Sequence, residues 1–223
     1  MTSHSFTLEQ NDRIIAHVEE EWGCEPGAMT SGRSVIPIRR AAVIDMRTEG
    51  FHLTLVPGAL HKVTGLGEAL GELGVDRAPD IDGWRGYLPA NTCPESDPQV
   101  TRLSRADQLE LEGLTVAVGT EEAGRAEVVV TDPLVVGLRE AGKLIAAASL
   151  KDRGDHVGAV AVLVHPDFRR QKVGCRVVAT LAFLARTRWR LLQYTTVAEN
   201  VASQRLALRL GFRMYSRERV WWV

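Results

Sequence analysis

The clearest alternation of apolar and polar stretches lies in the second half of the chain. Apolar, β-branched segments at residues 134–139, 143–150 and 156–164 are separated by short turns that contain Gly142 and Gly154. Segments of this length with turn-forming residues between them predict strands joined as hairpins. The sequence therefore predicts a three-stranded antiparallel meander. Its last strand ends in an unbroken apolar run and is expected to be buried on both faces.

After the meander the spacing of apolar residues alternates between helical and extended. It predicts a helix at residues 171–186, a strand at 189–197, a second helix at 200–210 and a last strand at 212–223. Another helix is expected to begin at Ser104, before the meander. A right-handed crossover through the helix at 171–186 would let strand 189–197 lie parallel to the last strand of the meander. The order predicts an α+β fold in which a mixed sheet carries helices on its faces.

The first half of the chain has a weaker pattern. Residues 8–22 have the apolar spacing of a helix, and residues 35–38 and 51–56 read as short strands. Residues 59–73 also have helical spacing, although three glycines weaken that helix. None of these segments carries a motif that indicates a chemical role.

A stretch rich in proline and glycine, residues 76–98, is the best candidate for a domain boundary. We therefore expect two regions. Residues 1–97 form an N-terminal accessory region, or partial second unit, to which the sequence assigns no role. Residues 98–223 form the main domain.

Composition narrows the class of protein. The chain has 223 residues, of which 45% are hydrophobic, and a net charge of −1. Its cysteines, Cys24, Cys93 and Cys175, share no metal or redox spacing, which favours reduced thiols and predicts no metal site. The start of the chain resembles no signal peptide, and no apolar run has the length of a membrane span. We therefore expect a cytoplasmic protein that does not insert into membranes.

A basic turn follows the buried strand. Pro166 ends the strand, because proline has no amide hydrogen for the ladder, and the next predicted helix opens near Gln171. Residues 167–190 contain seven basic residues and one acidic residue, a local charge of +6. The first amides of a helix have no partner within it and lie at the positive end of its dipole. Strand, basic turn and helix start together predict a binding site for a phosphate group.

These residues resemble a known family. Residues 164–174, Val-His-Pro-Asp-Phe-Arg-Arg-Gln-Lys-Val-Gly, resemble the acyl-CoA pyrophosphate loop of the GNAT superfamily of N-acetyltransferases. Residues 200–203 followed by 210–213 resemble that family's later motif, in which an Asn opens a helix that ends in Gly-Phe. The two motifs occur in the family's order and at its usual separation. The resemblance covers about residues 100–223.

The resemblance implies a GNAT-like, mostly antiparallel mixed sheet with a central parallel pair and flanking helices, plus an N-terminal extension. It also implies transfer of an acetyl or other acyl group from acyl-CoA, as co-substrate, to a small-molecule or peptide amine. The accessory region would then shape the acceptor pocket. The strand backbone would pair with the pantetheine arm, the amides after it would hold the pyrophosphate, and Asn200 would lie near the reactive end. The residues so assigned to the cofactor are Val162, Leu163, Val164, Arg169, Arg170, Gln171, Lys172, Val173, Gly174, Cys175 and Asn200.

Two positions depart from the family pattern. The family usually has glycine at the position of Lys172, where it lets backbone approach phosphate closely. Many members carry a tyrosine, as general acid for the leaving thiolate, at the position of Ala207. Asn200, Ser203 and Ala207 share one helix face, so Ser203 is the nearest candidate replacement. Alternatively, the thiolate takes its proton from solvent and Ser203 bonds to backbone.

Other interpretations remain open. Asn200 could simply cap its helix, and Cys175 could be a packed side chain or a thiol activated by the helix start. A degenerate relative that binds CoA without turnover is the main alternative, and Lys172 and Ala207 favour it. We expect no nucleic-acid partner, because beyond Phe183 and Trp189 the basic stretch lacks interleaved aromatic residues that stack on bases. Trp221-Trp222, on a strand expected at a sheet edge, is a candidate contact in a homodimer.

Overall fold

The chain packs as two units, each of which draws on both halves of the sequence. The computed structural model describes residues 6–48, 51–60 and 62–223. Unit 1 contains residues up to Tyr87 together with 195–204 and 213–223, and unit 2 contains residues 88–194 and 205–212. The two packed units therefore do not correspond to two consecutive stretches of sequence, because the C-terminal strand belongs to unit 1. The assignment of 1–97 and 98–223 as separate domains stays a prediction.

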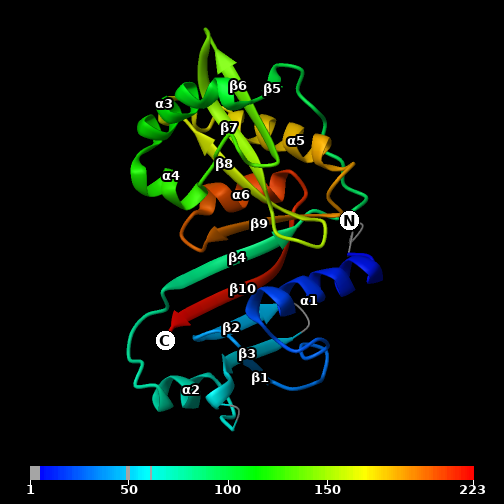
Figure 1. Ribbon diagram of the computed structural model, residues 1–223, viewed down its shortest axis with the longest axis vertical. Helices are drawn as coiled ribbons and strands as arrows, with labels where there is room; N and C mark the ends of the chain where they lie inside the picture. Colours follow the sequence, from blue (N-terminus) through cyan, green and yellow to red (C-terminus); the bar gives the residue numbers. More distant parts are fainter. Residues whose placement is uncertain (1–5, 49–50, 61) are drawn as a thin grey trace. The chain divides into compact units, whose positions relative to one another are not determined.

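Unit 1 contains a sheet of mixed direction. Its strands follow the order β1-β3-β2-β10-β4. The pair β1–β3 is parallel, and the other neighbours are antiparallel. In Figure 1, β10 at the C-terminus runs between β2 and β4. The elements of this unit are α1 (Leu8–Trp22), β1 (Val35–Ile38), β2 (Ala42–Thr48), β3 (His52–Pro57), η1 (Gly58–Leu60), α2 (Leu66–Glu72), β4 (Ile81–Tyr87) and β10 (Arg213–Trp222).

Helix α1 begins and ends where its caps predict. The Thr7 side chain accepts from the amide of Gln10, whose side chain in turn accepts from the amide of Thr7, and Gly23 closes the helix with a left-handed φ of 72°. The helix contacts the sheet through Glu21, which is bonded to Arg85 of β4. The short helix α2 packs on the other face, in a cluster with Val43 and Trp221.

Unit 2 contains the meander that the sequence predicts. Its strands follow the order β5-β6-β7-β8-β9, antiparallel as far as β8 and parallel between β8 and β9. Helices α3 and α4 pack on one face of the meander and α5 on the other (Figure 1). The elements are β5 (Val100–Arg102), η2 (Arg105–Asp107), α3 (Gln108–Val118), α4 (Thr120–Ala126), β6 (Leu134–Glu140), β7 (Lys143–Asp152), β8 (Val157–Val164), η3 (Pro166–Phe168), α5 (Val173–Ala185), β9 (Leu191–Val197), whose last residues fall in unit 1, and α6 (Val201–Arg209), which begins in unit 1.

The predicted fold class is confirmed: mixed strands, mostly antiparallel, include a parallel pair and carry helices on their faces. Three of the described strands were not predicted. Strand β2 follows β1 after a short turn, and β4 lies inside the proline- and glycine-rich stretch that we assigned to a boundary. Strand β5 lies between that stretch and the helix expected at Ser104.

The expectation that the last strand is an edge was wrong, because β10 pairs with β2 on one side and β4 on the other. Trp221 is consequently buried against α2, whereas Trp222 is 44% exposed and contacts Trp22 of α1. The sheet edge therefore no longer supports a homodimer contact at these tryptophans.

Candidate functional site

The pairing between β8 and its parallel neighbour β9 ends before β8 itself ends. The register with β9 runs from Val157 opposite Leu191 to Val160 opposite Tyr194, while β8 itself continues to Val164. On its other side β8 stays paired with β7 as far as Val164. The second half of β8 therefore has a ladder partner in unit 2 on one side only.

One hydrogen bond between β8 and β7 shows in which direction the remaining backbone amides and carbonyls of β8 point. The amide of His165 donates to the carbonyl of Ile145 at 2.9 Å, which makes these residues a hydrogen-bonded pair of the antiparallel ladder. Bonded and non-bonded pairs alternate along such a ladder. The amides and carbonyls of Val162 and Val164 must then point away from β7. They point toward the side of β8 where pairing with β9 has already ended. The side chain of Val164 turns toward Gly174 at the start of α5.

The loop between β8 and α5 has an unusual backbone. The His165 ring accepts from the amide of Asp167 at 3.3 Å and caps the short helix η3. Arg170 and Lys172 then both adopt a φ of 62°, in the left-handed region that glycine prefers. Alternating backbone conformations of this kind turn successive amides toward one point and form an anion-binding concavity.

Helix α5 starts without a protein cap. Its first internal bond runs from the amide of Arg176 to the carbonyl of Lys172, at 3.1 Å, and the side chain of Lys172 makes no capping bond. Over the residues that the structure describes, no hydrogen bond takes the amides of Val173, Gly174 or Cys175. These three donors lie at the positive end of the helix dipole, so the start of α5 attracts an anion.

The basic side chains of the loop divide into two sets. Arg176 is held by Asp97 at 2.5 Å, and this hydrogen bond keeps the pKa of Asp97 below its ordinary value. Arg169 is held by Glu122. Arg170 and Lys172 are exposed, and neither takes part in an ion pair within the described part of the chain. Their charges remain available to a ligand.

Gly174 and Cys175 have packing roles as well. Gly174 is buried, and a Cβ at this position would lie 2.7 Å from a methyl of Leu206 and 3.3 Å from one of Val164. The glycine therefore lets α6 and β8 approach α5. Cys175 is half-buried, and burial raises the pKa of its thiol despite the charges of Arg209 and Lys172. A thiolate activated by the helix start is not found here.

The residues of the second motif fall in both units. In unit 1, the Asn200 side chain accepts from the amide of Ser203 at 3.0 Å, so Asn200 caps α6. Ser203 is partly buried. In unit 2, Ala207 is fully buried and offers no hydroxyl. The predicted site residues on β8, the loop and the start of α5 thus lie together within unit 2. Asn200 and Ser203 belong to unit 1.

Sequence reasoning missed two acidic residues that order this loop. Glu122 of α4 and Asp97 lie far from it in sequence and belong to no motif. Only the fold brings their carboxylates to Arg169 and Arg176.

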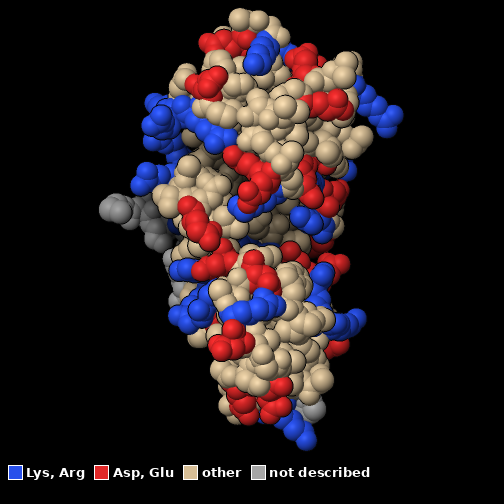
Figure 2. Space-filling model, turned by 90° about the vertical axis from the view of Figure 1, so that its left-hand side faces the viewer, with Lys and Arg blue, Asp and Glu red and all other residues tan. Residues whose placement is uncertain are grey.

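The described residues offer neither a metal site nor a membrane span. In the ranges that the structure describes, no cluster of three or more His, Cys, Asp or Glu side chains could hold a metal ion. No helix in those ranges has the length and apolar character to span a membrane. On the face shown in Figure 2, basic and acidic atoms intermingle over most of the surface.

Comparison with known proteins agrees with the geometry of unit 2. Residues 105–212 match the sequence model of the acetyltransferase (GNAT) family. No curated protein matches the sequence. Similar solved structures include a GNAT-family acetyltransferase of Novosphingobium aromaticivorans (19% identity, TM-score 0.53, covering 63% of each chain). Others are a GNAT-family acetyltransferase of Colwellia psychrerythraea (16%, 0.54, 69% of this chain and 61% of the other) and a GCN5-related N-acetyltransferase of Kribbella flavida (20%, 0.52, 70% and 63%).

At these identities the structural likeness shows the fold, and the match spans less than two thirds of each of those chains. The sequence match locates the pattern of the GNAT family in the C-terminal half of the chain, at residues 105–212, and the solved structures show a shared fold.

Proposed function

We propose that the protein is an N-acyltransferase that moves an acetyl or other acyl group from acyl-CoA to an amine by direct attack. One observation carries this proposal: the one-sided end of β8 is followed, after a single loop, by the uncapped start of α5. A strand edge that can pair with an amide-containing chain, followed by donors for a diphosphate, matches the two chemically distinct parts of CoA. The match to the family pattern supports the general reaction class.

The residues present fit such a ligand. The backbone groups of Val162 and Val164 that face away from β7 can pair with the amides of the pantetheine arm, as an added strand would. The amides of Val173, Gly174 and Cys175 can hold the diphosphate, with Arg170 and Lys172 supplying charge. No metal is needed in this scheme, because the backbone donors and basic side chains supply the positive potential.

The reaction follows from the same donors. The lone pair of the amine attacks the thioester carbonyl carbon, and an outward amide of β8, at Val162 or Val164, stabilises the developing oxyanion. The carbon–sulfur bond then breaks. The thiolate takes a proton from solvent or from Ser203, and the proton lost by the attacking nitrogen passes to a base or to water. We further propose that Asn200 contacts the cofactor near its reactive end and that residues 1–97 shape the site of a small-molecule or peptide amine.

A proline at position 162 tests this scheme. The amide of Val162 is not used by the ladder with β7, so proline removes the outward donor and leaves that ladder intact. The matched control is Val162→Ala, which truncates the side chain and keeps the amide. Val162→Pro should bind CoA about two- to tenfold more weakly than Val162→Ala through the lost hydrogen bond. It should lose roughly a hundredfold or more in kcat/KM if this amide holds the oxyanion.

The measurements are the CoA-induced rise in melting temperature and the release of free CoA thiol with a panel of amines. Circular dichroism shows whether the proline variant keeps its fold. If Val162→Pro binds CoA and turns over like Val162→Ala, the pantetheine arm does not lie along this strand at Val162.

A CoA-binding module without turnover is the second candidate, and two observations favour it. Lys172 occupies a left-handed position that glycine fills in the family, and Ala207 is buried where many members have an acidic hydroxyl. The same measurements separate the two functions. A melting shift with CoA but no thiol release for any amine supports the binding module, whereas amine-dependent release supports the enzyme.

A further inference from the structure

Arg169 lies at the junction of three elements in unit 2. Its Nη2 atom donates to both carboxylate oxygens of Glu122 on α4, at 3.0 and 2.9 Å. Its Nε atom donates to the carbonyl of Val164, the last residue of β8, at 3.3 Å. One guanidinium therefore links α4, the loop and the end of β8.

The carbonyl that Arg169 occupies is one of the outward groups of β8. Val164 points its amide and carbonyl away from β7, so its carbonyl belongs to the edge that would receive the pantetheine arm. While Glu122 holds Arg169 in this position, the guanidinium covers an acceptor of that edge. It also directs its charge toward a carboxylate on α4.

We propose that Glu122 and Arg169 form an ion-pair latch over the Val164 carbonyl, which acyl-CoA must open to bind. This inference rests on the proposed function. When the latch opens, the Val164 carbonyl becomes available to the pantetheine arm and Arg169 becomes available to the diphosphate. Glu122 then acts as a positioning residue that lowers the affinity for the cofactor.

The strength of the pair sets the size of the effect. Both side chains are partly exposed, Arg169 at 41% and Glu122 at 52%, so solvent screens their attraction. Opening an exposed pair of this type should change a binding constant by about two- to fivefold. Glu122→Ala should therefore bind CoA about two- to fivefold more tightly than a variant that loses the same charge elsewhere.

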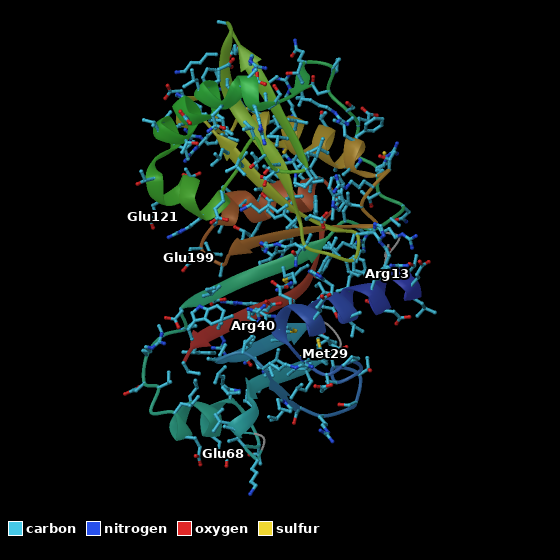
Figure 3. The ribbon with its side chains drawn as sticks, viewed as in Figure 1. Arg13, Met29, Arg40, Glu68, Glu121 and Glu199 are labelled. Carbon is cyan, nitrogen blue, oxygen red and sulfur yellow. The ribbon has the colours of Figure 1, made fainter. Side chains whose placement is uncertain are left out.

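The chain offers that matched control in the preceding residue. Glu121 also lies in the first turn of α4, where it pairs with Arg125 of the same helix. In the part of the chain that the structure describes, no hydrogen bond or ion pair joins Glu121 to Arg169. Figure 3 places Glu121 on the outer side of α4. Glu121→Ala removes one negative charge from the same turn and leaves the latch intact. Comparing the two variants removes the general effect of charge on binding an anionic ligand.

The experiment is isothermal titration of the full chain with CoA, for the wild type, each single variant, Arg169→Ala and the Glu122→Ala/Arg169→Ala double variant. The latch predicts tighter binding for Glu122→Ala than for Glu121→Ala. It also predicts that Arg169→Ala and the double variant differ by no more than the wild type and Glu121→Ala do, because beyond its general charge Glu122 acts only through Arg169. The advantage of Glu122→Ala should shrink as salt rises, since salt weakens the exposed pair in the wild type.

The outcomes separate the latch from the proposed function. Binding by the wild type with equal affinities for the two glutamate variants overturns the latch alone. Weaker binding by Glu122→Ala also overturns it, because Glu122 would then orient Arg169 for the ligand. An advantage of Glu122→Ala over Glu121→Ala that persists in full without Arg169 overturns it as well. If neither wild type nor any variant binds CoA, the proposed function and the latch both fail.

Discussion

The two units treat their polar groups in opposite ways. In unit 1, charged side chains are buried and paired: Arg85 is 4% exposed and donates to both carboxylate oxygens of Glu218 and to Glu21. In unit 2, β8 is wholly apolar and β7 is apolar from Leu144 to Ala148, and the polar groups that stand out are backbone donors at the end of β8 and the start of α5. Unit 1 pairs buried charged side chains such as Arg85 and Glu218 with one another, whereas the start of α5 in unit 2 leaves backbone amides without a partner among the described residues.

This difference bears on where a ligand should be sought. A buried charge that lacks a partner is costly, so the pairs in unit 1 are explained by folding alone. Uncapped amides at a helix start, beside a one-sided strand, are also satisfied by water, but they suit an anionic ligand far better than the paired charges do. The contrast predicts that changes in unit 1 mainly alter stability and that changes at the loop of unit 2 mainly alter ligand binding.

The largest effect is expected from Arg85→Ala. This change leaves the buried carboxylate of Glu218 without its bidentate partner, and breaking a buried pair in this way costs about 3–5 kcal/mol of unfolding free energy. Urea unfolding measures it. The control is Arg13→Ala on helix α1 (Figure 3). Its partner Glu9 lies one turn away and is exposed, so the loss should cost under about 0.5 kcal/mol. Similar losses in both variants would contradict a paired interior in unit 1.

The next effect depends on pH. Asp45 is 1% exposed, and although burial alone would raise its pKa, hydrogen bonds from His52 and Arg219 hold the pKa below its ordinary value. A carboxyl with a lowered pKa stabilises the fold above the pKa of the unfolded chain, about 4, and loses that contribution as the pH falls further. Asp45→Asn should therefore cost about 2 kcal/mol at neutral pH and progressively less below about pH 4.

Urea unfolding of the wild type and Asp45→Asn at neutral pH and near pH 3 checks this sign. A difference that stays constant or grows as the medium becomes acidic would show that Asp45 is not stabilised as a carboxylate.

The sequence was sufficient for the meander and the elements that follow it, although not for β5 or α4, because the signals of the meander region are local. Apolar strands, turn glycines and the basic stretch each specify structure within a few residues, so the meander, α5 and the parallel strand could be predicted in order. The same reasoning failed for β4, where Gly83 and Gly86 suggested a turn. Trp84 folds over Gly86, where a Cβ would lie 2.3 Å from its ring, so the glycine serves packing within a strand. That reason exists only once β4 has neighbours.

The candidate site shows the same limit. The positions of Arg169, Lys172 and Gly174 followed from a motif, but the contacts of Arg169 with Glu122 and of Arg176 with Asp97 depend on tertiary structure. The pairing of β10 with both β2 and β4 also joins residues far apart in the chain. No local pattern encodes these long-range contacts.

A smaller effect is expected at Lys172. The left-handed backbone conformation costs a non-glycine residue about 1–2 kcal/mol of folding free energy. Glycine avoids this cost but loses more conformational freedom on folding, so only part of the difference appears as added stability. Lys172→Gly should therefore raise the unfolding free energy by about 0.5–1 kcal/mol. Lys172→Ala is the control, since it removes the same charge and keeps the Cβ. If glycine and alanine give equal stability, the backbone at position 172 is not strained.

The smallest effect concerns the thiols and tests the site without changing it. Cys93 is exposed, Cys175 is half-buried, and Cys24 is buried with its pKa raised to about 11. A maleimide should modify Cys93 first, Cys175 slowly and Cys24 only on unfolding.

If CoA sits on the amides next to Cys175, a concentration about ten times Kd should slow labelling of Cys175 about tenfold. Peptide mapping by mass spectrometry follows each site, with Cys93 as the internal reference. CoA binding that leaves the Cys175 rate unchanged would place the diphosphate away from the start of α5, and the contrast between the two units would then no longer locate the ligand.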